Sequence, residues 1–556
     1  MDKALFHRNA SQNSTIYAGL TALVADEFEN SRVSIRQMLQ GLGVQNVDQT
    51  ASGKGVLESC RARRYDIILC DFRLTGGKNG QQVLEELREL KLLKPTNIFI
   101  IVSAETSRDV VMGIMESQPD EYLSKPFTQA VLARRLERQF LQTQALAKMK
   151  ENQAKGRYSQ LIQACIEHIQ EEGRYTPWCK RTLVDAYLAT QQFDQVEQLC
   201  QAELSVRDLD WALLGLAKKE AAQGHNDAAI VILEKLLRLF PQTINAYDLM
   251  AKCLEDSGRL EEAQSVLDDA IKISPRIHKR QKHMATVSMA NGDTQSALKA
   301  SQQTVRLGIN SIHENPDDYI QLVDIVAESA DSVESSVDRK RLLNEASQAL
   351  AIVGKRFADD DSVKLRKSLA ESRFHAAQGQ KKEAQNALTN AKQIAAEMEG
   401  GLPPDLVVEY GKTLYNAGEH EQAESILASL VNDQNSSAHL KQLAADFLDE
   451  PVSSGAKAQA KALNKDGLAS YAKKEYLEAI EQFKTALNYS PRHPGLNLNL
   501  VQTCLKLMEA KGEEAYLVAE CVQAFQRLRH VSPAHKQHKR LISLKEYLVK
   551  HYNVTF

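Results

Sequence analysis

The residues of this chain that could do chemistry are three carboxylates, one hydroxyl and one amine near the N-terminus: Asp26, Glu27, Asp71, Ser103 and Lys125. Three carboxylates in one place repel one another unless a divalent cation neutralises them, and hard oxygen ligands suit Mg²⁺. One carboxylate could then attack phosphorus to form an aspartyl phosphate, with an ammonium and a hydroxyl holding the phosphoryl oxygens. Asp71, Lys125 and Ser103 supply these three groups.

Short apolar runs carry these residues and predict the strands of an α/β domain. The runs are TALVADE at 21–27, YDIILCDF at 65–72, NIFIIVSAE at 97–105 and DEYLSKP at 120–126. Runs of this length, bounded by turn residues and separated by helical patterns, are typical of buried parallel strands. Because ligands of such sheets lie at the carboxyl ends of the strands, the polar residues should meet at one edge.

Over residues 19–141 this pattern resembles the receiver domain of two-component response regulators. The matching residues are the acidic pair Asp26 and Glu27, the phospho-acceptor Asp71, the switch residues Ser103 and Tyr122, and Lys125-Pro126-Phe127. The spacings agree with the family, since 71 − 27 = 44 and 125 − 103 = 22. The resemblance implies a flavodoxin-like fold with a five-stranded parallel sheet. It also implies phosphorylation of Asp71 by a sensor histidine kinase or a phosphotransfer protein.

The resemblance further implies an Mg²⁺ site formed by Asp26, Glu27, Asp71 and the backbone carbonyl of Arg73. Glu27 replaces the commoner Asp, so its carboxylate reaches further. The loop that follows Asp71, residues 73–80, is rich in glycine and one residue longer than is usual in the family. A receiver that no longer takes phosphate is the alternative, and the complete set of carboxylate, hydroxyl and lysine argues against it.

Two further interpretations concern single side chains near the site. We expect Arg73 and Glu105 to pair across its mouth and slow hydrolysis, the alternative being two solvated charges worth under about 1 kcal/mol. We expect Tyr122 to turn inward on phosphorylation. The alternative for this tyrosine is half-buried packing at a strand end.

After residue 142 the chain repeats itself every 34 residues. Glycines and alanines recur at this interval, with 258 − 224 = 34 and 292 − 258 = 34, as follows: Gly224, Gly258 and Gly292, then Ala229, Ala263 and Ala297. Pro241 and Pro275 share the interval. This pattern resembles the tetratricopeptide repeat, a pair of antiparallel helices that stacks into an all-α solenoid. Glycine permits the left-handed helix end, and alanine permits close helix packing.

The resulting prediction is a multidomain chain with five segments. These are a flexible N-terminus (1–18), the receiver (19–141), helical repeats (142–450), a linker (451–458), and further repeats with a capping helix (459–556). The helical pattern that begins near Thr128 continues without Gly or Pro to Gly156, so one helix should join the receiver to the first repeat. Such a joint could transmit a signal or could be a rigid spacer.

Composition narrows the range of functions. Lys and Arg number 69 against 72 Asp and Glu, a net charge of −3, which gives no global reason to expect nucleic acid or an anionic membrane as partner. No signal peptide and no run of roughly 20 apolar residues is present, so we expect a soluble cytoplasmic protein without a membrane partner. The eight cysteines contain no CxxC pair, which favours buried free thiols.

The leading interpretation is a bacterial two-component response regulator, an adaptor whose repeats bind an unknown protein partner under control of Asp71. We expect no enzyme activity beyond the receiver's own phosphoryl transfer and slow dephosphorylation, because no other catalytic motif follows. One alternative is a nucleic-acid-binding regulator that uses the basic C-terminus, although a capping helix explains those charges better. Another is a phosphate sink without output. A homodimer is left open.

Overall fold

The computed structural model describes residues 17, 19–330, 335–398, 401–433, 436–445, 454–512, 515–528, 531 and 537–552. These residues form two compact units that divide between Ile325 and Val326. Most of the predicted N-terminal segment lies outside the described residues, but Tyr17 is buried, with its ring centroid 6.3 Å from that of Phe140. Pro451, where we expect a break between repeats, also lies outside them.

A five-stranded parallel sheet forms the core of the first domain and confirms the predicted fold. Its strands are β1 (Thr21–Ala25), β2 (Asn46–Thr50), β3 (Ile67–Asp71), β4 (Ile98–Ser103) and β5 (Glu121–Ser124). Their spatial order is β2-β1-β3-β4-β5. No apolar run predicted β2, because this strand lies at the sheet edge and only Val47 among its residues is buried.

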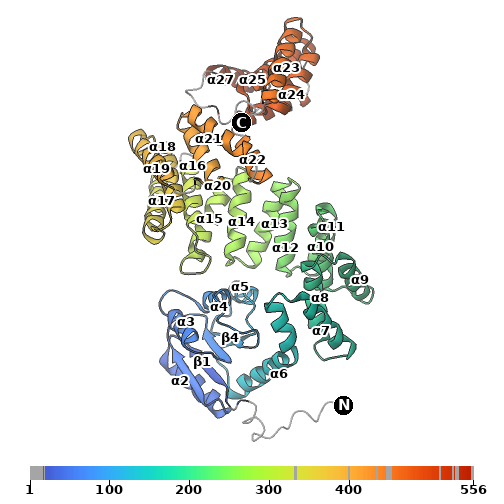
Figure 1. Ribbon diagram of the computed structural model, residues 1–556, viewed down its shortest axis with the longest axis vertical. Coiled ribbons are helices and arrows are strands. Elements are labelled where there is room, and N and C mark those ends of the chain that lie inside the picture. The colour runs from blue at the N-terminus through green and yellow to red at the C-terminus, as the bar shows by residue number, and fades with distance from the viewer. Residues whose placement is uncertain are drawn as a thin grey trace. The chain divides into compact units, whose positions relative to one another are not determined.

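Helices cover both faces of the sheet (Figure 1). They are α2 (Glu29–Gly41), α3 (Gly53–Ala62), α4 (Gly80–Glu89), α5 (Arg108–Glu116) and α6 (Gln129–Ala154). Helices α3, α4 and α5 share one core with alternate residues of the central strands, such as Ile68. Helices α2 and α6 share the core on the other face, which contains Ile67 and Leu69. This alternation is the burial expected of doubly wound parallel strands.

Helix α6 continues without a break from the receiver into the repeats, as the sequence predicts. Leu132 and Leu136 near its start are buried in the sheet core, and Leu146 and Met149 near its end are buried against the first repeat helices. Glu121 at the start of β5 fixes the helix by ion pairs to Arg138 and, at 3.3 Å, to Arg135. The two cores are therefore joined by one rigid element of 26 residues.

The repeats of the first unit are antiparallel helix pairs. Their helices are α7 (Tyr158–Gln170), α8 (Thr176–Ala189), α9 (Phe193–Leu204), α10 (Asp210–Ala222), α11 (Asn226–Leu239), α12 (Ile244–Asp256), α13 (Leu260–Ile273), α14 (His278–Ala290), α15 (Thr294–Gly308) and α16 (Pro316–Ser329), the last of which crosses into the second unit. The three periodic glycines have φ of +80°, +75° and +75°, and the periodic alanines are fully buried. The 34-residue pattern thus marks the tight turns and close helix contacts of α10–α15.

The second unit is also entirely helical over its described residues. Its helices are α17 (Ser336–Arg356), α18 (Asp361–Ala377), α19 (Lys381–Glu397), α20 (Pro404–Asn416), α21 (His420–Asn432), α22 (Ala438–Ala445), α23 (Ser454–Ala472), α24 (Tyr476–Tyr489), α25 (Pro494–Lys511), α26 (Ala515–Arg527) and α27 (His538–Tyr552). At Gly467 a β-carbon would lie 2.6 Å from the Phe483 ring, so glycine is needed where α23 crosses α24.

Candidate functional site

The strand ends bring four of the predicted residues to one edge of the sheet. Asp26 directly follows β1, Asp71 ends β3, Ser103 ends β4 and Lys125 directly follows β5. These four strands are neighbours in the order in which they are named. The first three side chains are buried, with Asp71 at 7% exposure. Packing of the central strands therefore positions the site.

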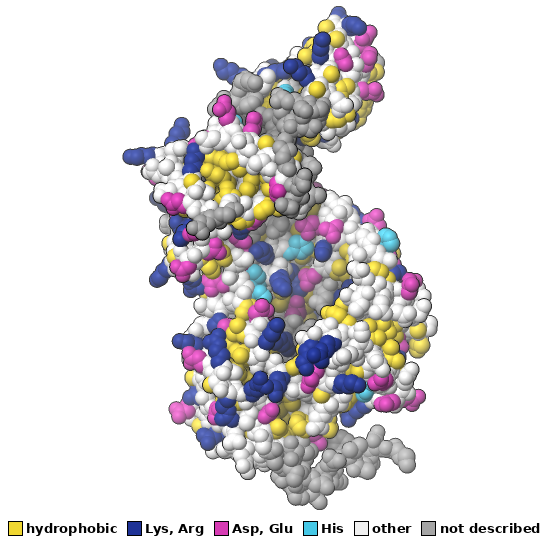
Figure 2. Space-filling view, in the orientation of Figure 1, with side chains coloured by type: hydrophobic (Ala, Val, Ile, Leu, Met, Phe, Trp, Pro, Cys, Tyr) yellow, Lys and Arg dark blue, Asp and Glu magenta, His cyan; other side chains and the backbone are white. Residues whose placement is uncertain are grey.

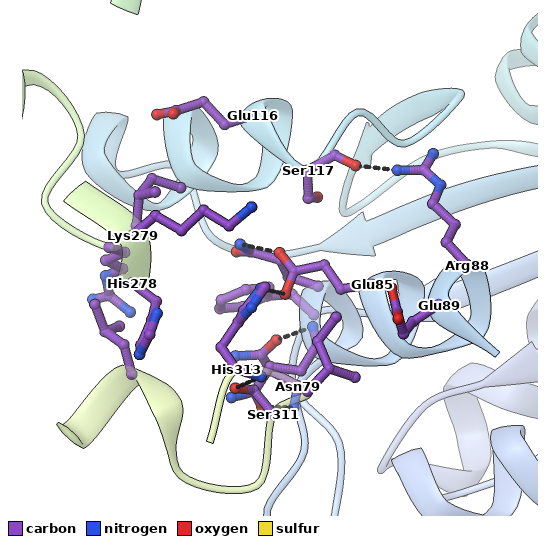
Figure 3. A pocket seen from close by; sticks show the side chains of 17 residues that line it. Asn79, Glu85, Arg88, Glu89, Glu116, Ser117, His278, Lys279, Ser311 and His313 are labelled. Carbon is purple, nitrogen blue, oxygen red and sulfur yellow. Dashed lines mark hydrogen bonds and ion pairs between the residues drawn. The ribbon is translucent and has the colours of Figure 1, made fainter. Parts of the chain in front are cut away.

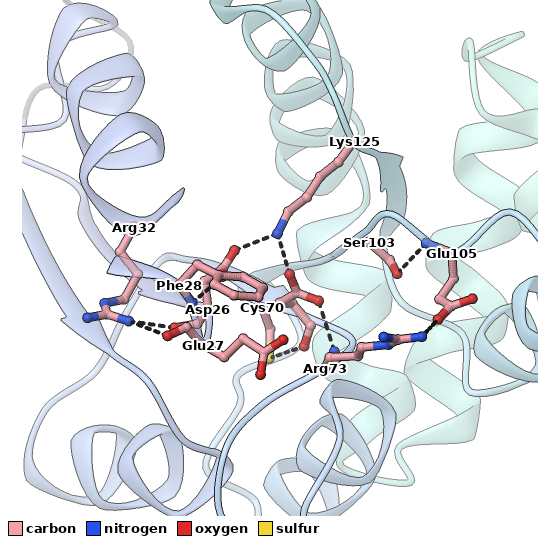
Figure 4. A network of polar contacts seen from close by, with 10 residues as sticks. Asp26, Glu27, Phe28, Arg32, Cys70, Arg73, Ser103, Glu105 and Lys125 are labelled. Atoms are coloured by element: carbon pink, nitrogen blue, oxygen red, sulfur yellow. Dashed lines mark hydrogen bonds and ion pairs between the residues drawn. The ribbon is translucent and has the colours of Figure 1, made fainter. Parts of the chain in front are cut away.

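Lys125 lies at the centre of the site and contacts two carboxylates (Figure 4). Its Nζ is 2.5 Å from Oδ2 of Asp26 and also forms an ion pair with Oδ2 of Asp71. Burial lowers the pKa of Lys125, but the hydrogen bonds to the two carboxylates outweigh it and raise the pKa overall. The lysine therefore stays protonated and can donate to a phosphoryl oxygen placed beside Asp71.

Backbone amides orient the remaining carboxylate oxygens. Phe28 N–H donates to Oδ1 of Asp26 at 2.9 Å, and Arg73 N–H donates to Oδ1 of Asp71 at 2.8 Å. Burial raises the pKa of Asp71, and the opposing effects of Lys125 and the Arg73 amide do not cancel it. Ionised Asp71 is thus a desolvated carboxylate in a fixed orientation, which suits a nucleophile.

The second side of the site is formed by Ser103, Glu105, Arg73 and Tyr122. Ser103 Oγ accepts a hydrogen bond from Glu105 N–H at 3.0 Å, and the half-buried Tyr122 hydroxyl donates to the Glu105 carbonyl. Arg73 forms an ion pair with the Glu105 carboxylate, so the predicted pairing is confirmed. Its effect on hydrolysis stays a prediction, as does the inward turn of Tyr122.

The donor chemistry of the site suits Mg²⁺. Asp26 and Asp71 supply hard oxygen atoms and, with Lys125, leave an excess negative charge. Glu27 is half-buried beside Asp26 (Figure 4). Within the described ranges, no three Asp, Glu, His or Cys side chains are grouped closely enough to hold a metal ion. The predicted Mg²⁺ ligands, Asp26, Glu27, Asp71 and the backbone carbonyl of Arg73, stay a prediction.

The glycine-rich loop after Asp71 returns the chain closely to the strand that carries this residue. Gly80 N–H donates to the Phe72 carbonyl at 2.9 Å, and a β-carbon on Gly80 would lie 2.4 Å from the Asp71 carbonyl oxygen. Asn79 and Gln82 then form a capping box that starts α4. Sequence reasoning noted the loop but missed the role of Gly80, for which the only signal is its place at the loop end.

Sequence reasoning also missed a contact between the receiver and the later repeats of its own unit. Lys78 Nζ is 2.6 Å from the Asn310 carbonyl oxygen, between α15 and α16. Glu116 at the end of α5 accepts from Arg280 of α14 at 2.8 Å. A cavity of about 520 Å³ lies between α4, α5 and these repeats (Figure 3). These partners lie up to 232 residues apart in the chain, and no local sequence pattern indicates such a contact.

The remaining sequence predictions concern thiols and the membrane. All eight cysteines are buried free thiols, as predicted. Burial raises the pKa of Cys60 to about 11, which makes this thiol a poor nucleophile. In the part of the chain that the structure describes, every helix is too short or too polar to cross a bilayer.

Comparison with known proteins matches one segment of the receiver part of this chain and one segment of its helical part. The family model described as a response regulator receiver domain matches residues 22–137, and a tetratricopeptide repeat model matches residues 220–282. The chemotaxis protein CheY of Pseudomonas aeruginosa is 28% identical over 118 residues, which are 21% of this chain and 94% of CheY.

Solved structures give similar matches. Chemotaxis protein CheY4 of Vibrio cholerae is 23% identical, with a TM-score of 0.20, and the match covers 22% of this chain and 98% of CheY4. The receiver domain of a Pseudomonas aeruginosa sensor histidine kinase, solved with magnesium in its active-site cleft, is 28% identical, with a TM-score of 0.20, over 22% of this chain and 98% of that domain. The C-terminal part of a tetratricopeptide-repeat protein of Cytophaga hutchinsonii is 12% identical, with a TM-score of 0.35, and the match covers 46% of this chain and 95% of that part.

Proposed function

We propose that this chain, a response regulator receiver domain joined to tetratricopeptide repeats, is a phosphorylation-controlled adaptor. Asp71 accepts a phosphoryl group from a histidine kinase or a phosphotransfer protein, and the repeats bind a protein partner. The observation that carries the proposal is the arrangement around Asp71. A buried carboxylate shares the Lys125 ammonium with Asp26, and Ser103 ends the adjacent strand.

The chemistry follows from these groups. A carboxylate oxygen of Asp71 attacks phosphorus, the bond from phosphorus to the donor's imidazole nitrogen breaks, and that nitrogen keeps the electron pair. Lys125 donates to a phosphoryl oxygen, and Ser103 can donate to another once its hydroxyl turns from the Glu105 amide. Mg²⁺, when bound, neutralises the charge that the phosphoryl group brings. Water later hydrolyses the acyl phosphate and restores the carboxylate.

A role in nucleic-acid binding receives less support from the C-terminal helices. Arg540, one of the basic residues there, donates to Asn499 at 2.9 Å and to Gln502 at 2.7 Å on α25. Leu541 and Leu548 of α27 are buried in the same core as α25. Two of the other basic residues, Arg529 and Lys536, lie outside the described residues. These contacts favour a capping helix over a nucleic-acid surface.

Phosphorylation of the full chain tests the proposal. We expect Mg²⁺ and acetyl phosphate to add one phosphoryl group to the wild type and none to Asp71→Asn, as measured by intact mass. Ser103→Ala should still be phosphorylated but should lose the change in amide hydrogen exchange that phosphorylation causes in α5. Incorporation that persists in Asp71→Asn, or hydrogen exchange that is identical in both states of the wild type, would overturn the proposal.

A further inference from the structure

The contact between the receiver and the repeats is electrostatically one-sided. Two ion pairs between described residues cross it, Arg280–Glu116 at 2.8 Å and Arg276–Asp109 at 3.7 Å, and Nε2 of His313 lies 3.4 Å from a carboxylate oxygen of Glu85. In each pair the acid belongs to the receiver and the base to the repeats. The surface is hollowed beside this contact, and basic and acidic side chains both lie around the hollow (Figure 2). The repeats therefore present a cationic surface to an acidic occupant.

Arg280 is held in place by the repeats themselves. Its Nε and Nη2 atoms donate to the two carboxylate oxygens of Asp248 on α12, both at 2.7 Å, and Nη1 donates to the Ser274 carbonyl at 3.1 Å. The side chain is 1% exposed. Departure of Glu116 would leave this guanidinium oriented, with donors facing outward. Such a preorganised fork is suited to a second carboxylate.

The present occupant of this surface is helix α5. Its two acids are seven residues apart (116 − 109 = 7), about two turns, so both lie on the same side of the helix. Between them Gly113 faces Arg276, and a β-carbon there would lie 3.6 Å from Cβ of Arg276, an ordinary contact distance, so this position accepts a small residue. Lys279 extends into the neighbouring cavity (Figure 3). The surface thus fits a helix with two carboxylates and a small residue between them.

We propose that the cationic face formed by Arg276, Lys279 and Arg280 is the partner-binding surface of the repeats, that the partner presents an acidic helix, and that α5 occupies the face as its internal competitor. This inference rests on the proposed function, because phosphorylation supplies the reason for α5 to leave. The receiver segments at the contact follow residues of the phosphorylation site along the chain. The loop with Lys78 and then α4 follow Asp71, and α5 follows Ser103.

A labelled peptide of residues 107–118, which contains the sequence of α5, tests the face in the full chain. We expect Glu116→Gln to bind this peptide at least tenfold more tightly than the wild type does, because the internal competitor is weakened. The same peptide with Asp109→Asn and Glu116→Gln is the matched control and should bind at least tenfold more weakly. Equal binding of the two peptides, or equal binding by wild type and Glu116→Gln, would overturn the inference.

A disulfide provides a second test within one protein. In Gly113→Cys/Arg276→Cys the two β-carbons would be near the 3.6 Å separation seen here, within the range of disulfides, and the native cysteines are buried. Because Arg276 is itself part of the face, the reduced protein should bind the peptide more weakly than wild type through the remaining Arg280, and oxidation should abolish that binding. Binding that oxidation does not change contradicts the inference, as does complete loss of binding in the reduced, phosphorylated protein.

The phosphorylation arm separates this inference from the proposed function. Acetyl phosphate with Mg²⁺ should raise affinity for the peptide at least tenfold in the wild type and should leave Asp71→Asn unchanged. If Glu116→Gln increases peptide binding but phosphorylation of the wild type does not, the binding face is supported and the proposed control by phosphorylation is contradicted. If phosphorylation changes hydrogen exchange in α5 while no variant binds the peptide, the proposed function is supported and the binding face is contradicted.

Discussion

Lys125 and Arg280 each hold two carboxylates, but they do so in opposite ways. Lys125 joins Asp26 and Asp71 within the receiver, and its side chain remains 20% exposed. Arg280 joins Asp248 of the repeats to Glu116 of the receiver and is 1% exposed. A lysine ammonium is a point charge that can redirect its donors, whereas a guanidinium is a planar fork with fixed directions. The first cluster is built for exchange of ligands, and the second for a contact of defined geometry.

The largest expected effect is at the exchangeable cluster. Lys125→Ala should lower phosphoryl incorporation from acetyl phosphate by at least about 100-fold, because an ammonium aimed at the phosphoryl oxygens is lost. The thermal stabilisation that Mg²⁺ gives should persist, since the two carboxylates remain. Lys54→Ala, at a lysine that is 81% exposed, is the matched control and should behave as wild type. Loss of the Mg²⁺ effect in Lys125→Ala would contradict this distinction.

The next effect concerns the fixed cluster. Arg280→Gln should lower the free energy of local opening of α5 by about 2 kcal/mol, because two carboxylates lose a buried, bidentate partner. This value is at the low end of the range for removing one partner of a buried charge pair, because Asp248 is 40% exposed. Native-state hydrogen exchange of the α5 amides measures it. Arg276→Gln, which removes a half-exposed partner of Asp109, should change it by less than about 1 kcal/mol. Similar losses in the free energy of opening of α5 in both variants would show that Arg280 does not hold the contact more strongly than Arg276 does.

A smaller effect follows from the burial of Asp71. Because the pKa of Asp71 is raised in the fold, its ionisation is easier in the unfolded chain and costs stability at pH 7. Asp71→Asn, which removes the desolvated charge, should therefore stabilise the receiver at pH 7. The gain should vanish below about pH 3.9, where the carboxyl group is protonated in both states. Thermal unfolding measured as a function of pH gives this gain in stability. A loss of stability of Asp71→Asn at pH 7 would contradict the prediction.

The smallest effect is expected at the mouth of the site. Arg73 is 70% exposed, so Arg73→Ala should change stability by no more than about 0.5 kcal/mol. The lifetime of the acyl phosphate should nevertheless shorten a few-fold, because the Arg73–Glu105 pair no longer covers the approach of water. The decay of phosphorylated protein after removal of acetyl phosphate measures the lifetime. An unchanged decay rate would show that the pair is only a surface contact.

The sequence predicted those parts of the fold and site that local residue patterns determine. The residues at the carboxyl ends of apolar strands, such as Asp71 and Ser103, were placed correctly because parallel strands converge by rule. The glycine and alanine periods marked α10–α15 because each unit repeats the same turn. Strand β2 escaped because an edge strand needs little apolar surface. The ion pairs of Arg280 were not predicted because they join elements that are far apart in the chain, and such contacts leave no periodic pattern in the sequence.

Helix α6 fixes where the later repeats meet the receiver. It is one helix of 26 residues with each end packed in a different core. Every residue inserted between those cores would rotate all downstream repeats by about 100° and move them by about 1.5 Å along the helix. Even a seven-residue insertion, close to two full turns, would carry Arg280 about 10 Å out of register with Glu116. The contact between Arg280 and Glu116 therefore constrains the length of α6, although Arg280 comes 126 residues after the helix ends (280 − 154 = 126).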